Sequence, residues 1–144
     1  MLWEPKLFSN NQPTSREVIT MQDFPEFMKN SKNRINQSDQ HTEDIEGYYY
    51  EGTDGSQMAF WTCFADRESA SHIHEFDEYM VCIQGEYTVI IDGKQTVLRR
   101  GDEFFIPKGT LHGGRCVAGT RTIHAFDGRR IQGVPERGVG STGI

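Results

Sequence analysis

The sequence predicts an all-β domain built as an antiparallel sandwich or barrel. Between residues 45 and 127, short segments rich in aromatic and β-branched residues follow one another closely. Gly, Pro or Asp-Gly turn signals bound most of these segments. Short strands at this spacing favour antiparallel sheets over the parallel sheet of an α/β protein.

Length and composition fit one domain with its own core. The chain has 144 residues, of which 35% are hydrophobic and 25% charged. Three regions differ in composition and residue pattern: a polar extension (1–44), a strand-rich barrel (45–127) and a tail (128–144). The tail contains five glycines and almost no apolar pattern, so its composition favours flexibility.

One short helix is expected in the extension. Asp23 is a suitable N-cap, and Pro25 and Glu26 suit the first turn. Residues 30–44 are rich in Asn, Ser, Gln and Asp, which is typical of a connector. The residues expected to share one face of the helix are Phe24, Phe27 and Met28.

The barrel begins with aromatic strands and contains one clear hairpin. Asp92-Gly93 separates two β-favouring runs and supplies the positive φ angles of a type I′ turn. The expected strands lie near residues 48–50, 58–64, 87–91, 94–98, 103–106, 111–117 and 120–126.

Two segments carry the residues that point to chemistry. On a strand, His72 and His74 point to the same side, and Glu78 keeps the same parity. A local bend would bring the Glu78 carboxylate to the same centre. In the second segment a Pro-x-Gly turn precedes His112 and fixes the entry of the next strand. A lone histidine is usually structural, but this combination favours a metal site.

The two segments resemble the two sequence motifs of the cupin superfamily. They read His72-x-His74-x₃-Glu78-x₆-Gly85 and Gly101-x₅-Pro107-x-Gly109-x₂-His112. The resemblance covers roughly residues 45–127. It implies a double-stranded β-helix (jelly roll) with a metal inside the barrel, held by His72, His74, Glu78 and His112. In one departure, Cys116 stands where family members often have Asn.

Three neutral imidazoles and one carboxylate suit one divalent transition metal ion per chain. Iron, manganese, nickel, copper, cobalt and zinc all accept such ligands, so the ligand set leaves the metal open. In octahedral geometry two positions remain for a small molecule or dioxygen. A residual positive charge suits an enolate, a diol or a carboxylate.

The favoured function is a metal-dependent enzyme of dioxygenase type acting on a small enolisable, diol or carboxylate-bearing molecule. An isomerase or epimerase is second within this class. A non-catalytic binding or sensor module is the main alternative, and a metal-free structural barrel ranks last. Beyond the ligands, His124 is a weak candidate for a catalytic residue, since strand histidines are more often structural.

Charge and segment composition limit the partners. A net charge of −6 disfavours nucleic acid, and no apolar stretch approaches the length of a membrane span. The chain start shows no secretory signal, so we expect a cytoplasmic protein and reduced, buried thiols at Cys63, Cys82 and Cys116. The edge strands of an open sheet expose unpaired backbone groups, and a second copy of the chain could cover them. We therefore expect a homodimer.

Overall fold

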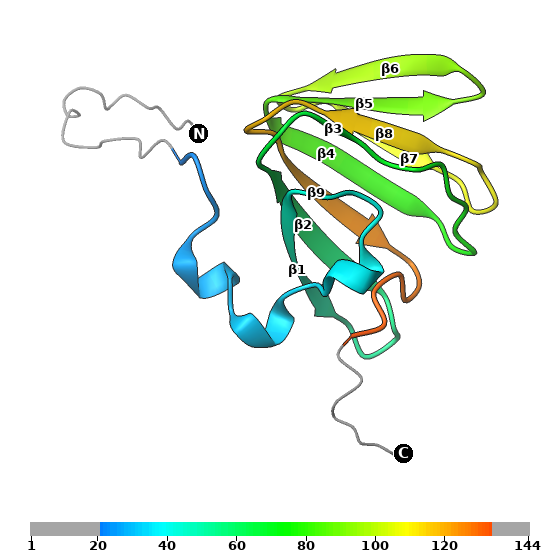
Figure 1. The fold of residues 1–144 in the computed structure, drawn as a ribbon. Coiled ribbons are helices and arrows are strands. Elements are labelled where there is room, and N and C mark those ends of the chain that lie inside the picture. Colours follow the sequence, from blue (N-terminus) through cyan, green and yellow to red (C-terminus); the bar gives the residue numbers. More distant parts are fainter. Residues whose placement is uncertain (1–20, 134–144) are drawn as a thin grey trace, which may run out of the picture.

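The computed structural model describes residues 21–133. Short 3-10 turns precede the strands, as Figure 1 shows. The turns are η2 (Glu26–Met28), η3 (Ser31–Asn33) and η4 (Gln37–Asp39). The strands are β1 (Ile45–Glu51), β2 (Gln57–Cys63), β3 (Arg67–Glu68), β4 (Glu78–Gln84), β5 (Glu86–Ile91), β6 (Lys94–Arg99), β7 (Glu103–Ile106), β8 (Gly113–Cys116) and β9 (Arg121–Phe126).

The strands form two antiparallel sheets, which confirms the predicted all-β, jelly-roll architecture. A five-stranded sheet has the order β1-β2-β9-β4-β7, and a four-stranded sheet has the order β3-β8-β5-β6. Strands that are distant in sequence are neighbours in both sheets, as β2 and β9 are. Figure 1 shows β1 and β2 at one side of the barrel and the β5–β6 hairpin at the opposite side.

Strands β5 and β6 form the hairpin that the Asp92-Gly93 pair predicts. Asp92 and Gly93 both have positive φ, 51° and 76°, between the paired residues Ile91 and Lys94. This conformation matches the twist of the flanking strands, which is why Asp-Gly is favoured there.

Alternation along the strands places apolar side chains between the sheets. Met80 and Cys82 of β4 point inward, two residues apart, beside Val89 of β5. Leu98 and Ile106 complete this cluster. A second cluster contains Ala59, Trp61 and Phe126, together with two residues from outside the barrel strands, Ile35 and Ile131.

The N-terminal extension differs from the expected helix. Only a 3-10 turn forms, its N-cap position is Pro25, and Asp23 bonds the neighbouring Phe24 N–H instead. Phe24 is 6% exposed and Phe27 is 80% exposed, so they do not share a buried face. The extension instead packs through Phe24 against Phe60, because three residues per turn cannot build an α-helical stripe.

The segment after the last strand is held against the barrel as far as it is described. Ile131 is 0% exposed, and the buried Gln57 side chain bonds its backbone N–H and C=O, each over 2.8 Å. Satisfying both backbone groups lets this irregular segment be buried. Residues 134–144, the remainder of the predicted flexible tail, lie outside the described residues.

A disulfide corrects the expectation of three reduced thiols. Cys63 of β2 is bonded to Cys116 of β8, and the bond therefore links the two sheets. Cys82 is free and buried. The sequence prediction failed because residues 53 positions apart meet only through the fold.

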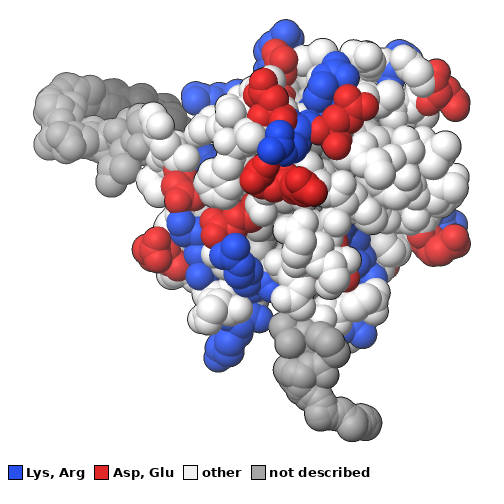
Figure 2. All heavy atoms as spheres, viewed as in Figure 1, with Lys and Arg blue, Asp and Glu red and all other residues white. Residues whose placement is uncertain are grey.

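The surface carries both signs of charge. Figure 2 shows Lys and Arg interspersed with Asp and Glu on one face rather than gathered in a continuous basic stripe. No helix in residues 21–133 is long and apolar enough to span a bilayer.

Candidate metal centre

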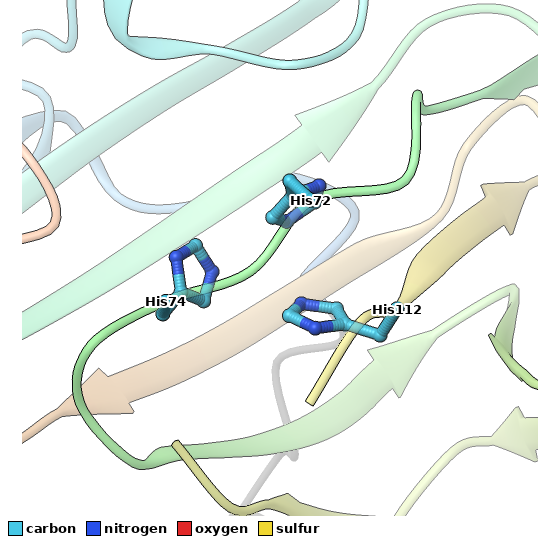
Figure 3. A group of neighbouring side chains, drawn as sticks. All are labelled: His72, His74 and His112. Atoms are coloured by element: carbon cyan, nitrogen blue, oxygen red, sulfur yellow. The ribbon is translucent and has the colours of Figure 1, made fainter. Parts of the chain in front are cut away.

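The backbone brings three histidines to one point from two segments. His72 and His74 lie on the extended connection between β3 and β4, and His112 immediately precedes β8. His72 and His112 form an isolated bridge in which each N–H donates to the other's carbonyl, over 2.9 and 3.0 Å. The three side chains converge in Figure 3.

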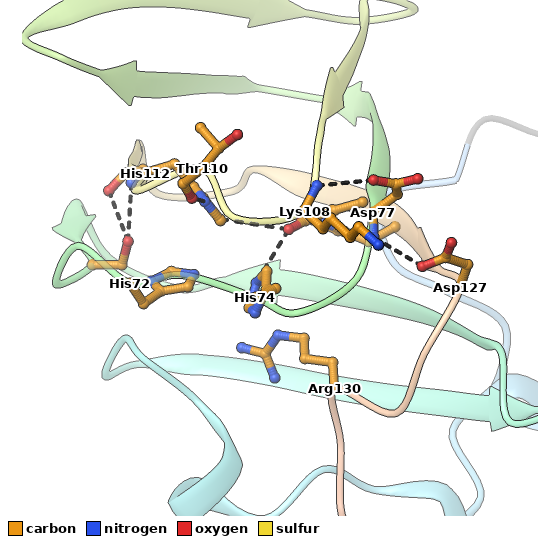
Figure 4. A network of polar contacts seen from close by, with 12 residues as sticks. His72, His74, Asp77, Lys108, Thr110, His112, Asp127 and Arg130 are labelled. Atoms are coloured by element: carbon orange, nitrogen blue, oxygen red, sulfur yellow. Dashed lines mark hydrogen bonds and ion pairs between the residues drawn. The ribbon is translucent and has the colours of Figure 1, made fainter.

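Glu78 begins β4 after the bend anticipated from the sequence. The chain bends at Glu75 and Phe76, and the loop is pinned through Asp77. The Asp77 carboxylate accepts from the Lys108 N–H, and its own N–H donates to Asp127, each over 2.8 Å. Figure 4 shows these contacts beside the histidines. The two motif segments are thus held together independently of any ligand.

The predicted ligand residues meet inside the barrel. The nearest ring nitrogens of His72, His74 and His112 all lie within 4.8 Å of one another. Glu78 Oε1 lies 3.3 Å from His74 Nε2 and 3.5 Å from His112 Nε2. His74, Glu78 and His112 are buried, and His72 is half-buried.

The donor atoms fit a cation. His74 Nε2 and Glu78 Oε1 are buried, and neither has a hydrogen-bond partner among the described residues. Such atoms are costly unless something pairs with them. Nδ1 of His72 lies 2.8 Å from the Ala70 carbonyl, and Nδ1 of His112 lies 2.9 Å from the Thr110 carbonyl. A carbonyl only accepts, so each Nδ1 carries the proton and each Nε2 keeps a lone pair for a metal.

Electrostatics favour the ligating forms of two groups. Burial lowers the pKa of His72 to about 4, so its imidazole is neutral near pH 7. Burial by itself would raise the pKa of Glu78, but the surrounding imidazoles of His112, His124 and His74 hold it well below its ordinary value. A neutral imidazole and an ionised carboxylate are the forms that bind a divalent ion.

His124 lies behind Glu78. It is buried in β9, its Nδ1 donates to Glu78 Oε2 over 2.7 Å, and its Nε2 lies 2.9 Å from Thr122 Oγ1. The ring meets Trp61 edge-on, with centroids 4.9 Å apart. Both nitrogens are engaged, so the geometry points to a residue that orients Glu78.

Sequence reasoning missed several residues that line the same cavity. Arg130 follows β9, and its guanidinium lies among the cavity walls. His41, an exposed residue of the connector, stacks on His72 with ring centroids 3.9 Å apart. Tyr87 of β5 is also a wall residue, and burial raises its pKa. Arg130 and His41 come from irregular segments without periodicity, so no sequence signal marked them.

Comparisons with known proteins agree with this architecture. A sequence-family model of the cupin domain matches residues 61–130. Comparison with curated proteins gives no significant match. KdgF from Halomonas sp. is a structural neighbour with 20% identity and a TM-score of 0.54, covering 64% of this chain and 89% of that chain.

Two further neighbours have the same fold. An RmlC-like cupin from Shewanella frigidimarina is 22% identical with a TM-score of 0.58, covering 72% of this chain and 86% of that chain. The polyketide cyclase RemF from Streptomyces resistomycificus is 16% identical with a TM-score of 0.51, covering 60% of this chain and 65% of that chain. The family model and the two motifs identify residues 61–130 as a cupin domain, and the structural neighbours share its fold.

Proposed function

We propose that the protein binds one divalent transition metal ion through His72, His74, Glu78 and His112, and that it acts on a small organic molecule in the cavity. One observation carries the proposal. The buried, unpartnered His74 Nε2 and Glu78 Oε1 face one another across 3.3 Å, at the centre of the histidine cluster. A bound cation would satisfy both atoms at once.

The favoured activity is that of a metal-dependent enzyme of dioxygenase type. A bound ion of this class supplies Lewis-acid or redox chemistry to a small enolisable, diol or carboxylate-bearing molecule. The chain's own residues would shape that reaction. Trp61 and Val89 give the cavity apolar walls that exclude water, while Tyr87 and Arg130 add polar groups to it.

A non-catalytic binding module is the second candidate, and one observation favours it. Among the described cavity residues outside the proposed ligands, no side chain is an obvious general base. His124 has both nitrogens engaged, Tyr87 has a raised pKa, and desolvation lowers the pKa of His41 to about 4, which makes it a weak base. Such a site could hold a ligand without turning it over.

Metal analysis of the purified protein tests the proposed site. We expect about one equivalent of a transition metal per chain in the wild type and a large loss in His112→Ala, since a ligand is removed. His41→Ala is the matched control, because it removes a cavity imidazole that is outside the proposed ligand set. Equal metal in the wild type and in His112→Ala would overturn the proposal.

Thermal unfolding gives a second readout that needs no substrate. A chelator should lower the Tm of the wild type and of His41→Ala, because a metal that binds only the folded state stabilises it by mass action. The Tm of His112→Ala should not respond. Oxygen uptake with enol, diol and 2-oxo acid candidates then separates an enzyme from a binding module.

A further inference from the structure

Arg130 lies between two neighbouring spaces of the molecule. It lines the cavity that contains the four proposed ligands, and it also lines a shallower depression bordered by Ser38, Ile73 and Gln132. His41 and His74 line both spaces as well. The Arg130 guanidinium points toward His74 in Figure 4 and is therefore directed to the side of the cavity that holds the proposed ligands.

The Arg130 side chain is fixed in this place. Its Nη1 donates to the Asp39 carbonyl over 2.6 Å, and its guanidinium lies 5.2 Å from the centroid of the Trp61 ring. The Phe126 ring is 5.9 Å away. A guanidinium has five N–H donors, so this arrangement orients the group while leaving most of its donors for another partner.

The charge of Arg130 has no acidic partner in the part of the chain that the structure describes. No carboxylate of residues 21–133 comes within 4.0 Å of its guanidinium nitrogens. The other arginine of the cavity wall, Arg67, is paired with Asp44, and the adjacent Arg129 is paired with Glu51. A cation partly withdrawn from water and left unpaired is costly, and an anionic ligand would remove that cost.

We propose that Arg130 binds the carboxylate of a small organic acid, whose adjacent oxygen then faces the centre formed by His72, His74, Glu78 and His112. This inference rests on the proposed function and narrows its substrate class to anions. A divalent ion offset by Glu78 leaves one positive charge, and Arg130 adds a second. The cavity would thus attract a carboxylate although the chain carries a net charge of −6. The planar guanidinium matches a carboxylate through two parallel hydrogen bonds.

Glycolate and glycolamide are the probes that test whether Arg130 binds a carboxylate. Both offer a hydroxyl and a carbonyl oxygen, and only glycolate carries a charge. NMR titration of the ¹⁵N-labelled protein, metal-free and loaded with Zn²⁺, gives the two Kd values and follows the Arg130 Nε–H signal. The variants are Arg130→Gln, Arg130→Lys, which keeps the charge, and Arg129→Gln, which removes the neighbouring arginine that lines only the outer depression and is paired with Glu51.

In the wild type and in Arg129→Gln we expect the Kd for glycolate to be lower than that for glycolamide by about tenfold or more. A hydrogen bond to a charged group contributes a free energy of this size. Arg130→Gln should lower this preference to about threefold or less, and Arg130→Lys should retain part of it. Glycolate, and not glycolamide, should shift the Arg130 signal. An unchanged preference in Arg130→Gln, or equal affinities in the wild type, would overturn the inference.

The two proposals fail separately. If the wild type takes up no Zn²⁺, the proposed metal function fails, and the titration of the metal-free protein decides the role of Arg130 alone. If Zn²⁺ binds to the wild type and to Arg130→Gln with the same stoichiometry but the preference for glycolate is unaffected, only the role of Arg130 fails.

Discussion

His124 and Glu78 form a buried hydrogen-bonded pair beside the candidate metal centre. Nδ1 of His124 donates to Oε2 of Glu78 over 2.7 Å, and the other carboxylate oxygen, Oε1, is left facing His74 and His112. A carboxylate only accepts, so Nδ1 carries the proton, and in the neutral ring Nε2 accepts from the Thr122 hydroxyl. The hydroxyl, the imidazole and the carboxylate thus form one chain that aims Oε1 at the centre.

This pair predicts that His124→Ala weakens metal binding although His124 is outside the proposed ligand set. We expect an increase in the Kd for Zn²⁺ of about 10- to 100-fold, because the Glu78 carboxylate loses the group that orients it. Competition with a chromophoric chelator measures this Kd. His124→Gln should recover part of the affinity, since an amide N–H can also donate to the carboxylate.

A purely structural role for His124 would give a different result. His124→Ala would then lower the Tm of the metal-free protein while leaving the Kd for Zn²⁺ at its wild-type value. Equal affinity in the two proteins would therefore contradict the positioning role.

The bond between Cys63 and Cys116 predicts a stability that depends on reduction. The bond closes a loop across the two sheets, so its loss should lower the free energy of unfolding by about 2–4 kcal/mol through a less restricted unfolded chain. Urea denaturation of metal-free protein, with and without a phosphine reductant, measures the difference. A Cys63→Ser/Cys116→Ser double variant is the control, and its unfolding should not respond to the reductant.

Thiol labelling supplies an independent check on this pairing. Without reductant, an alkylating reagent should label only Cys82, and only after unfolding, because that thiol is buried. Labelling of three thiols in unfolded, unreduced protein would show that the bond is absent.

From the full burial of Ile131 we predict that the segment after β9 contributes to the stability of the core. Its side chain is fully buried beside Ala59 and Trp61, so Ile131→Ala should lower the free energy of unfolding by about 2–4 kcal/mol. The neighbouring exposed Gln132 offers a matched control, and Gln132→Ala should cost about 0.5 kcal/mol or less. Chemical denaturation measures both, and equal small losses would mean that this segment does not pack in solution.

Local signals in the sequence were sufficient for most of the strands and for the motif turns, although β3 and β4 were not among the expected strands. The motif glycine Gly85 shows why such signals work. Its φ is +79°, and an added Cβ would lie 2.7 Å from the Thr120 Cα, so both backbone conformation and space demand glycine. Gly109 likewise has a φ of +81° after Pro107, in the turn that leads to His112. Turn chemistry of this kind acts within a few residues and can be recognised from sequence.

The predicted convergence of His72 and His74 has a different structural basis from the one argued from the sequence. His72 and His74 were expected on a regular strand, but they lie on an extended connection that touches His112 through one isolated bridge. The parity argument still applied because an extended backbone alternates its side chains whether or not a full ladder forms. The structure brings these histidines and Glu78 together, and their role as ligands stays a prediction.

The all-β class, the hairpin at Asp92-Gly93 and the resemblance to the cupin superfamily could all be predicted from the sequence, because they depend on short-range patterns. The contact between Cys63 and Cys116, the position of His124 behind Glu78 and the place of Arg130 in the cavity wall became known from the folded structure alone. These relationships join residues far apart in sequence, often through irregular segments. Such contacts are set by the closure of the two sheets, which no local periodicity records.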